Sequence, residues 1–249
     1  MNRFLALSII LTSLLFPGVA NADLVISALG QTYTENFNSF AGTAATIPAN
    51  FTWSDSDFSP GGIYDASGAY INSNSTYALV FGDTSERAFG SKSPTSGTDF
   101  LNWSFINSTG VDISTFAVTW DVEQYSQNTR STTVDFNYNS NGGGFTQSGV
   151  VGTTLTSAIT GTESNLSSVS TTSRSVIVNL STPLASGQSI LFGWGIANGA
   201  GSGSNAHIGV DNLTVTAVPE PSAFLFGGLI CGVLGANQLR KRMANKVKS

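Results

Sequence analysis

The sequence predicts an all-β protein, an antiparallel β-sandwich of the jelly-roll type, with an N-terminal signal peptide and a single C-terminal transmembrane helix. Three observations predict this architecture. Apolar and polar residues alternate repeatedly through 23–217, clusters of Gly, Ser and Asn separate the alternating stretches, and an uncharged apolar run lies near the C-terminus. Period-two alternation is typical of strands with one buried face, and 23–217 contains no convincing helical period.

Residues 1–22 have the features of a signal peptide. Arg3 supplies a positive charge, and a short apolar run follows it. Ala20 and Ala22 then form the small-x-small pattern that precedes a cleavage site. We expect the general secretion machinery to export the chain and signal peptidase to leave Asp23 as the first mature residue. The apolar run is short for a membrane span, which favours a cleaved peptide.

The central region, 23–217, is expected to form one exported β-sandwich domain. Each alternating stretch predicts a strand with one wet face and one buried face. The clearest stretches are 101–105, 116–123, 134–138, 176–180 and 190–196. Turn-forming residues cover 139–144 and 198–205. Trp103, Trp120 and Trp194 fall in the apolar phase of their strands, so we expect them in the core.

The last predicted strand changes phase part-way. Ile208 and Val210 alternate in one phase, whereas Leu213 continues in the other. A slip of one residue moves side chains to the opposite face, and a β-bulge is the usual cause. The sequence therefore predicts a bulge at Asp211 and Asn212.

Charge and rare residues exclude several classes of function. Residues 23–217 carry a net charge of −10, which disfavours nucleic-acid binding and an anionic membrane surface. Cys231 is the only cysteine, so the chain has no internal disulfide and no Cys-based zinc site. His207 is the only histidine, and at a strand start we expect it to be structural rather than part of a catalytic triad.

The C-terminal segment, 218–249, has three parts in a fixed order. A stiff Pro-Glu-Pro motif comes first, an uncharged apolar stretch at 223–239 follows, and a basic tail at 240–249 closes the chain. As a helix the apolar stretch would span about 26 Å, which is a little short of a typical hydrocarbon core but feasible for a crossing. The basic tail would remain in the cytoplasm, with the body on the other side. The residues of the motif and of the basic cluster are Pro219, Glu220, Pro221, Arg240, Lys241 and Arg242.

This tripartite tail resembles the PEP-CTERM sorting signal of Gram-negative bacteria. The resemblance implies recognition by exosortase, a membrane protease-transpeptidase, and a link with exopolysaccharide and biofilm. It implies an inner-membrane-anchored precursor with its body in the periplasm, and a mature form on the cell surface or outside the cell. The residues named above would then be recognition elements, and the inner membrane a transient partner.

The body has a looser resemblance to secreted jelly rolls such as carbohydrate-binding modules and lectin-like sandwiches. The matching stretches are 35–40, Glu-Asn-Phe-Asn-Ser-Phe, and 207–215, which holds His-Ile-Gly-Val-Asp-Asn. Many members of that group hold a structural calcium between an early acidic residue and the aspartate of the last strand. The resemblance therefore implies a calcium site at Glu35 and Asp211, whose oxygens suit a hard cation. The alternative is that Asp211 bonds backbone amides of the bulge.

The sequence contains aromatic and acidic residues of the types that bind or cleave sugars. Aromatic rings at segment ends can stack on sugars, and the candidates for such a ligand site are Trp53, Tyr64, Tyr70 and Tyr125. Carboxylate pairs at 55/57 and 121/123 offer the groups of a glycoside hydrolase, although solvated strand faces often carry such acids. No other motif for catalysis stands out, and we expect no enzymatic activity.

Three functions follow as hypotheses. The first is a non-catalytic structural or adhesive role in biofilm or exopolysaccharide. The second is a glycan-binding module for matrix polysaccharide, and the third, less favoured, is a hydrolase of that polysaccharide. Sugar binding that depends on aromatic residues would favour the second, and sugar release that depends on acidic residues would favour the third.

Overall fold

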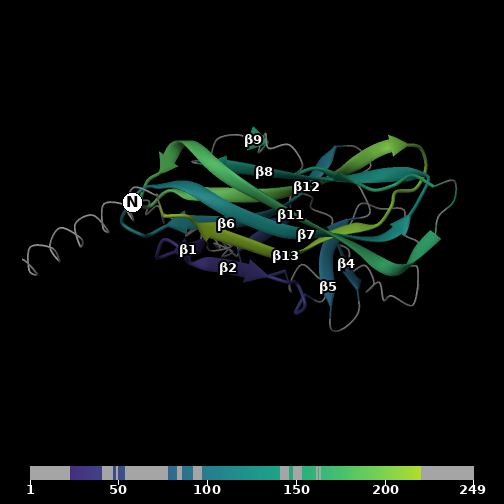
Figure 1. Ribbon diagram of the computed structural model, residues 1–249, viewed down its shortest axis with the longest axis horizontal. Helices are drawn as coiled ribbons and strands as arrows, with labels where there is room; N and C mark the ends of the chain where they lie inside the picture. The colour runs from purple at the N-terminus through teal and green to yellow at the C-terminus, as the bar shows by residue number, and fades with distance from the viewer. Residues whose placement is uncertain are drawn as a thin grey trace, which may run out of the picture.

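The computed structural model is a sandwich of two β-sheets (Figure 1). It describes residues 23–40, 47–48, 50–53, 78–82, 86–91, 97–140, 146–147, 153–160, 162 and 164–219. The predicted signal peptide and the predicted membrane helix at 223–239 lie outside these residues. Over the described ranges, no helix has the length and apolar character required to span a bilayer.

The first sheet has seven strands. Its strands, in spatial order, are β1 (Leu24–Ile26), β6 (Thr98–Asn107), β12 (Ser189–Gly201), β8 (Arg130–Ser140) and β10 (Leu155–Thr156), with β3 (Phe51–Trp53) beside β6 and β9 (Thr146–Gln147) beside β8. The pairing of β1 with β6 is parallel, and the other pairings in this sheet are antiparallel.

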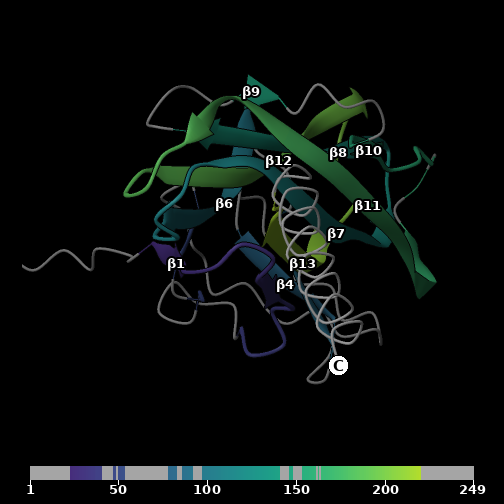
Figure 2. The same cartoon turned by 60° about the vertical axis from the view of Figure 1, so that its left-hand side comes forward.

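The second sheet has six strands and carries the candidate sites. In spatial order they are β11 (Ser164–Leu184), β7 (Ile113–Gln127), β13 (Ile208–Ala217), β5 (Arg87–Ser91) and β4 (Ala78–Gly82), with β2 (Thr32–Glu35) beside β13. All of these pairings are antiparallel. Figure 2 shows β11, β7 and β13 in one layer and β8 and β12 in the other.

The core lies between the sheets and is built largely from aromatic rings. The three tryptophans predicted to be buried are at most 2% exposed, which confirms that prediction. Trp120 of β7 stacks on Phe136 of β8 at 5.1 Å between ring centroids and meets Trp194 of β12 edge-on at 6.2 Å. Such pairs add roughly 0.5–1.5 kcal/mol beyond their buried area. The two layers are therefore joined through ring contacts.

The five strands predicted from alternation are all present, within β6, β7, β8, β11 and β12. The predicted turn at 198–205 is only partly correct, because β12 continues to Gly201 and bends follow at 202–204. The strand continues because β8 lies very close to β12 at this point: a Cβ placed at Gly199 would lie 2.1 Å from Ser131 Oγ. Glycine permits that approach, and a glycine-rich stretch therefore extends the strand.

The predicted bulge in the last strand is confirmed. The pairing of β13 with β7 shifts register between Asp211 and Thr214. Asn212 occupies the left-handed region with φ 50°, which asparagine tolerates better than most residues. The bulge lets Val210 and Leu213 both face the core, since each is fully buried.

Candidate functional site

Three carboxyl groups meet on the outer side of the second sheet. Glu86 lies just before β5, Glu123 belongs to β7 and Asp211 to β13. One oxygen from each lies within 4.8 Å of the others. Glu86 is exposed, whereas Glu123 and Asp211 are 5% and 0% exposed. We call these three residues the carboxylate cluster.

Strand register explains why the carboxylate cluster forms. Val122 pairs with Val210 and both are buried, so their neighbours Glu123 and Asp211 point to the opposite face of the sheet. Glu123 pairs with Gly209 of β13, and Gly209 pairs with Gly90 of β5. Because Gly209 and Gly90 have no side chains, the sheet surface next to Glu123 has room for the acidic side chains of the neighbouring strands.

The carboxyl group of Asp211 is poorly compensated within the described part of the chain. Neither carboxylate oxygen of Asp211 has a hydrogen-bond partner there. Burial raises the pKa of Asp211 to about 8; the backbone amide of Asn212 acts in the opposite direction, and the carboxylates of Glu86 and Glu123 raise the pKa further. A buried carboxylate next to two others is unfavourable unless a proton or a cation neutralises it.

Glu123 is better supplied with hydrogen-bond donors. The Tyr125 hydroxyl donates to one of its oxygens, and the Thr171 hydroxyl lies 3.5 Å from the other. Burial still raises the pKa of Glu123, while the bond from Tyr125 lowers it. Burial, and then the bond to Glu123, also raise the pKa of the Tyr125 hydroxyl, which therefore stays a donor.

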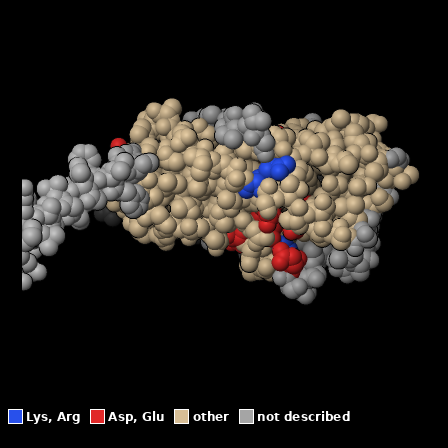
Figure 3. All heavy atoms as spheres, viewed as in Figure 1, with Lys and Arg blue, Asp and Glu red and all other residues tan. Residues whose placement is uncertain are grey.

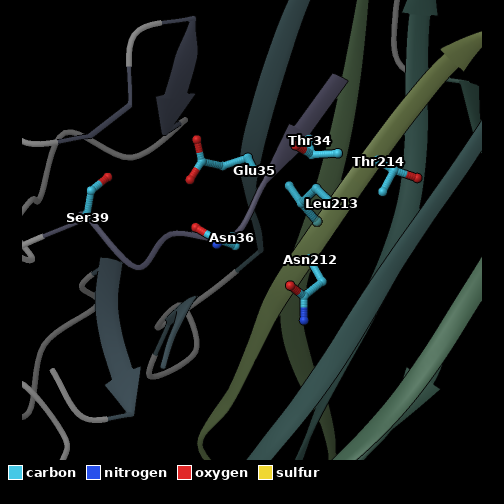
Figure 4. A pocket seen from close by; sticks show the side chains of 7 residues that line it. All are labelled: Thr34, Glu35, Asn36, Ser39, Asn212, Leu213 and Thr214. Carbon is cyan, nitrogen blue, oxygen red and sulfur yellow. The ribbon is translucent and has the colours of Figure 1, made fainter. Parts of the chain in front are cut away.

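A second feature is a polar pocket of about 400 Å³ at the junction of β2 and β13 (Figure 4). Its lining offers one carboxylate, two amides and three hydroxyls, and only one apolar side chain. The residues that line it are Thr34, Glu35, Asn36, Ser39, Asn212, Leu213 and Thr214. We call it the polar pocket.

Register and local turns place the lining residues. Thr34 pairs with Thr214, and Glu35 pairs with Leu213, so the end of β2 runs along the bulge of β13. Immediately after β2 the chain turns at Phe37, whose φ is 50°. The Phe37 amide donates to Glu35 Oε1 at 2.7 Å, which fixes the carboxylate at the turn.

Other lining groups are also held by neighbours. Asn36 Oδ1 accepts from the amide of Asn38 at 3.2 Å, and the Thr214 hydroxyl pairs with that of Thr119 at 2.6 Å. Burial raises the pKa of Glu35, and the backbone amides of Phe37 and Asn36 lower it. The polar pocket is therefore preorganised rather than assembled from free side chains.

The outer face beyond the polar pocket is rich in hydroxyl groups. Paired hydroxyls bridge β2 to β13 and β13 to β7, and a hydroxyl–amide bond bridges β7 to β11. The threonines that make these bonds are Thr32, Thr115, Thr119, Thr214 and Thr216. Together with Thr34, the register partner of Thr214, they form what we call the hydroxyl face. Figure 3 shows little charge over most of this side of the molecule, with acidic side chains gathered in one patch and a smaller basic patch next to it.

The residues predicted to bind ligands are placed differently from the expectation. Trp53 and Tyr125 are each 8% exposed, so neither offers an open ring face to a sugar. Tyr64 and Tyr70 lie outside the described residues. Among residues whose exposure is described, the exposed large hydrophobic side chains are all aliphatic.

The predicted calcium pair, Glu35 and Asp211, is divided between the two features. Asp211 belongs to the carboxylate cluster, whereas Glu35 lines the polar pocket. Sequence reasoning missed Glu86, which no motif marks, and the polar residues around Glu35. The bulge at Asn212 was the one available signal for the pocket.

Other predicted residues can be placed only in part. Asp121 and Glu123 do share a face of β7, as expected from their spacing, and 55/57 lie outside the described residues. His207 is fully buried directly before β13. The Asp23 carboxylate accepts from the hydroxyls of Ser104 and Ser189.

At the other end, β13 finishes at Ala217 and the next amide, that of Val218, donates to the Thr115 carbonyl at 2.9 Å. Pro219 follows. The remaining sorting residues, Glu220, Pro221 and 240–242, and the expected cleavage residues Ala20 and Ala22, lie outside the described part of the chain.

Comparison with protein-family models and with curated proteins gives no match. Among solved structures, the chain is similar to the CBM22-1 xylan-binding domain of Paenibacillus barcinonensis Xyn10C, with 9% identity, a TM-score of 0.40, and coverage of 78% of this chain and 99% of that one. It is also similar to the K3 adhesin domain of Lys-gingipain from Porphyromonas gingivalis, with 15% identity, a TM-score of 0.38, and coverage of 75% and 99%.

A further similarity is to the enzymatically active domain of tailspike protein 4 of bacteriophage CBA120, with 10% identity and a TM-score of 0.36. It covers 73% of this chain, which spans only 21% of the tailspike chain. TM-scores of this size assign neither a ligand nor a family.

Proposed function

We propose that this chain is an exported, non-catalytic binding module that recognises a neutral polysaccharide through the polar pocket. The observation that supports the proposal is the composition of the pocket lining: a carboxylate, two amides and three hydroxyls around a space of about 400 Å³. Pockets for drug-like molecules are mostly apolar, so a polar lining favours a ligand that is itself covered with hydrogen-bonding groups. A sugar ring meets that requirement.

The donors and acceptors of the pocket match those of a sugar. Glu35 accepts hydrogen bonds, the Asn36 and Asn212 amides offer both donors and acceptors, and hydroxyls do the same. Hydrogen bonds to these groups replace bonds to water, so each adds only about 0.5–1.5 kcal/mol. Several such hydrogen bonds in a preorganised pocket give a modest affinity for one sugar unit. A polysaccharide repeats that unit, so the overall binding becomes stronger when several units are bound at once.

The hydroxyl face provides a path for the rest of the polymer. It lies on β2, β13 and β7 next to the pocket, and neighbouring strands are about 4.8 Å apart. A polysaccharide chain that enters the pocket would lie across these strands and meet hydroxyls and threonine methyl groups. The net charge of −10 over 23–217 favours a neutral sugar over an acidic one.

The test is retention of the mature protein on immobilised exopolysaccharide from the producing bacterium. Thr34→Val removes one lining hydroxyl at constant shape, and Thr156→Val makes the same change at an exposed residue of β10 in the other sheet, away from the pocket and the hydroxyl face. We expect Thr34→Val to weaken binding about 2- to 10-fold, which corresponds to one hydrogen bond. Equal binding by the wild type and both variants would contradict the proposal.

We also propose that the chain reaches the cell surface through the sorting signal at 218–249. The motif order and the basic tail support this, as does the end of β13 two residues before Pro219. Replacing Pro219 and Pro221 with alanine should trap a larger, membrane-bound form. Unchanged processing and release of the variant would refute sorting by exosortase while leaving the polysaccharide proposal intact.

A structural role in the matrix and a hydrolase activity remain the two rivals. A structural role predicts no binding to soluble oligosaccharides from the matrix. A hydrolase predicts release of reducing sugar that is lost on Glu123→Gln, because Glu123 and its neighbours hold the acidic groups such chemistry uses. Binding without sugar release is the result that we expect.

A further inference from the structure

We propose that the carboxylate cluster of Glu86, Glu123 and Asp211 binds one calcium ion, which fastens the start of β5 to β7 and β13. The ligand set differs from the pair implied by the sequence resemblance, because Glu35 is not a member. The site is separate from the polar pocket, and the proposal does not depend on polysaccharide binding.

The size of the cluster fits calcium. Oxygen ligands lie about 2.3–2.6 Å from Ca²⁺, so two ligands on opposite sides of one ion are about 4.8 Å apart. The three oxygens of the cluster all lie within 4.8 Å of one another, so one ion can touch all three without movement of the strands. Magnesium demands near-ideal octahedral geometry and gives up its water reluctantly, so carboxylates from three separate segments favour calcium.

The need for a cation comes from Asp211. Its side chain is 0% exposed, and neither of its oxygens has a hydrogen bond of normal geometry within the described ranges; the Asn212 backbone amide and the Glu86 carboxyl group are the polar groups that act on it. A buried carboxylate without a donor or a counter-ion is strongly unfavourable, and its neighbours here are two more carboxylates. A divalent cation supplies the missing partner for Asp211 and balances the charges of the other two.

Exposure of Glu86 gives the ion a way in. Glu86 lies at the surface while the other two ligands are buried, so an ion held between them would have water on one side. Calcium takes six to eight oxygen ligands, and waters would complete the set. A partly open site of this kind typically binds in the range of about 10⁻⁴–10⁻³ M, as extracellular modules do.

The ion would have a definite structural effect. Glu86 comes from the segment before β5, whereas the other two ligands come from the centre of the sheet. Ion binding would therefore stabilise the β4–β5 side of the sheet against β13. The inside of a cell holds little free calcium, so we expect the cluster to bind its calcium ion only after the protein has been exported.

The experiment measures the melting temperature of the mature protein in chelator and in calcium chloride, with magnesium chloride as comparison. Glu86→Gln removes the exposed ligand and Asp211→Asn the buried one, both with little change in shape. Asp112→Asn removes a carboxylate of the exposed surface as a matched control. Glu35→Gln tests the pair implied by the resemblance.

We expect calcium at millimolar concentration to raise the melting temperature of the wild type and of the Asp112 and Glu35 variants, and magnesium to do so less. The rise should be lost in the Glu86 and Asp211 variants. In chelator at pH 8.5, Asp211→Asn should melt no lower than the wild type, because it removes a buried carboxyl group that is ionised at that pH. An absent calcium effect, or one that survives Glu86→Gln and Asp211→Asn, would overturn the proposal.

Discussion

Asp211 of β13 lies directly opposite Asp121 of β7, so two carboxyl groups share one face of one antiparallel pair. Like charges in that position are destabilising. The two residues differ in their surroundings: Asp121 accepts hydrogen bonds from Ser173 and from the Asn212 amide, whereas Asp211 is buried without such donors. Burial and the carboxylates of Glu86 and Glu123 also raise the pKa of Asp211, and the first prediction starts from this residue.

The stability of the metal-free protein should depend on pH through Asp211. Its pKa is about 8 in the folded protein and near 3.8 when exposed, so the folded state binds more protons between these values. The stabilisation is complete below about pH 4 and is lost as the pH rises towards 8. In chelator, the melting temperature should be higher at pH 5.5 than at pH 8.5, and Asp211→Asn should reduce the difference. A profile that rises with pH would contradict this assignment.

Removing the Tyr125 hydroxyl should destabilise the fold through Glu123. The hydroxyl donates to a carboxylate that is only 5% exposed, and a hydrogen bond to a charged group is worth about 1.5–3 kcal/mol. Tyr125→Phe should lower the free energy of unfolding by that amount in urea denaturation. Tyr33→Phe, which removes a hydroxyl bonded to the Val25 carbonyl at the surface, should cost less.

The bulge should tolerate glycine at position 212 better than valine. Asn212 has φ 50°, a conformation that costs a residue with a branched Cβ about 1–2 kcal/mol. Both substitutions remove the side-chain amide that donates to Asp121, so the comparison isolates the free-energy cost of the left-handed backbone conformation. We expect Asn212→Val to unfold at a lower urea concentration than Asn212→Gly, and equal midpoints would show that the bulge relaxes.

The ring contacts between the sheets should dominate the stability of the core. Trp120 is 1% exposed and touches Phe136 and Trp194 of the opposite sheet. Trp120→Ala should cost about 3–5 kcal/mol, as large-to-small changes in cores do. Ile177, which is 53% exposed, provides the surface control, and Ile177→Ala should leave the unfolding midpoint nearly unchanged.

Much of the fold could be predicted because alternation reports which face of a strand is buried. The tryptophans at 103, 120 and 194 lie in the core, and the phase slip at Asp211 and Asn212 marks a real bulge. Jelly-roll connectivity, the signal peptide and the membrane helix stay predictions. The sequence does not reveal that β12 extends through its glycines, because that depends on the approach of β8.

The sites were harder to predict because their residues are far apart in sequence. Glu86, Glu123 and Asp211 meet only because β7, β13 and β5 are adjacent in the sheet, and strand order is not encoded in periodicity. A related reason applies to two of the aromatic candidates: Trp53 and Tyr125 look peripheral in sequence, yet neighbouring strands bury both. Hydroxyl and amide residues are so common in this chain that those of the polar pocket carried no signal.

The most direct test of polysaccharide recognition is an NMR titration of the mature protein with oligosaccharides cut from the exopolysaccharide of the producing bacterium. We predict that the backbone amide shifts of Asn36, Ser39 and Asn212 change first, followed by those of the hydroxyl face. Shifts confined to the opposite sheet, or no shifts at millimolar oligosaccharide, would contradict it.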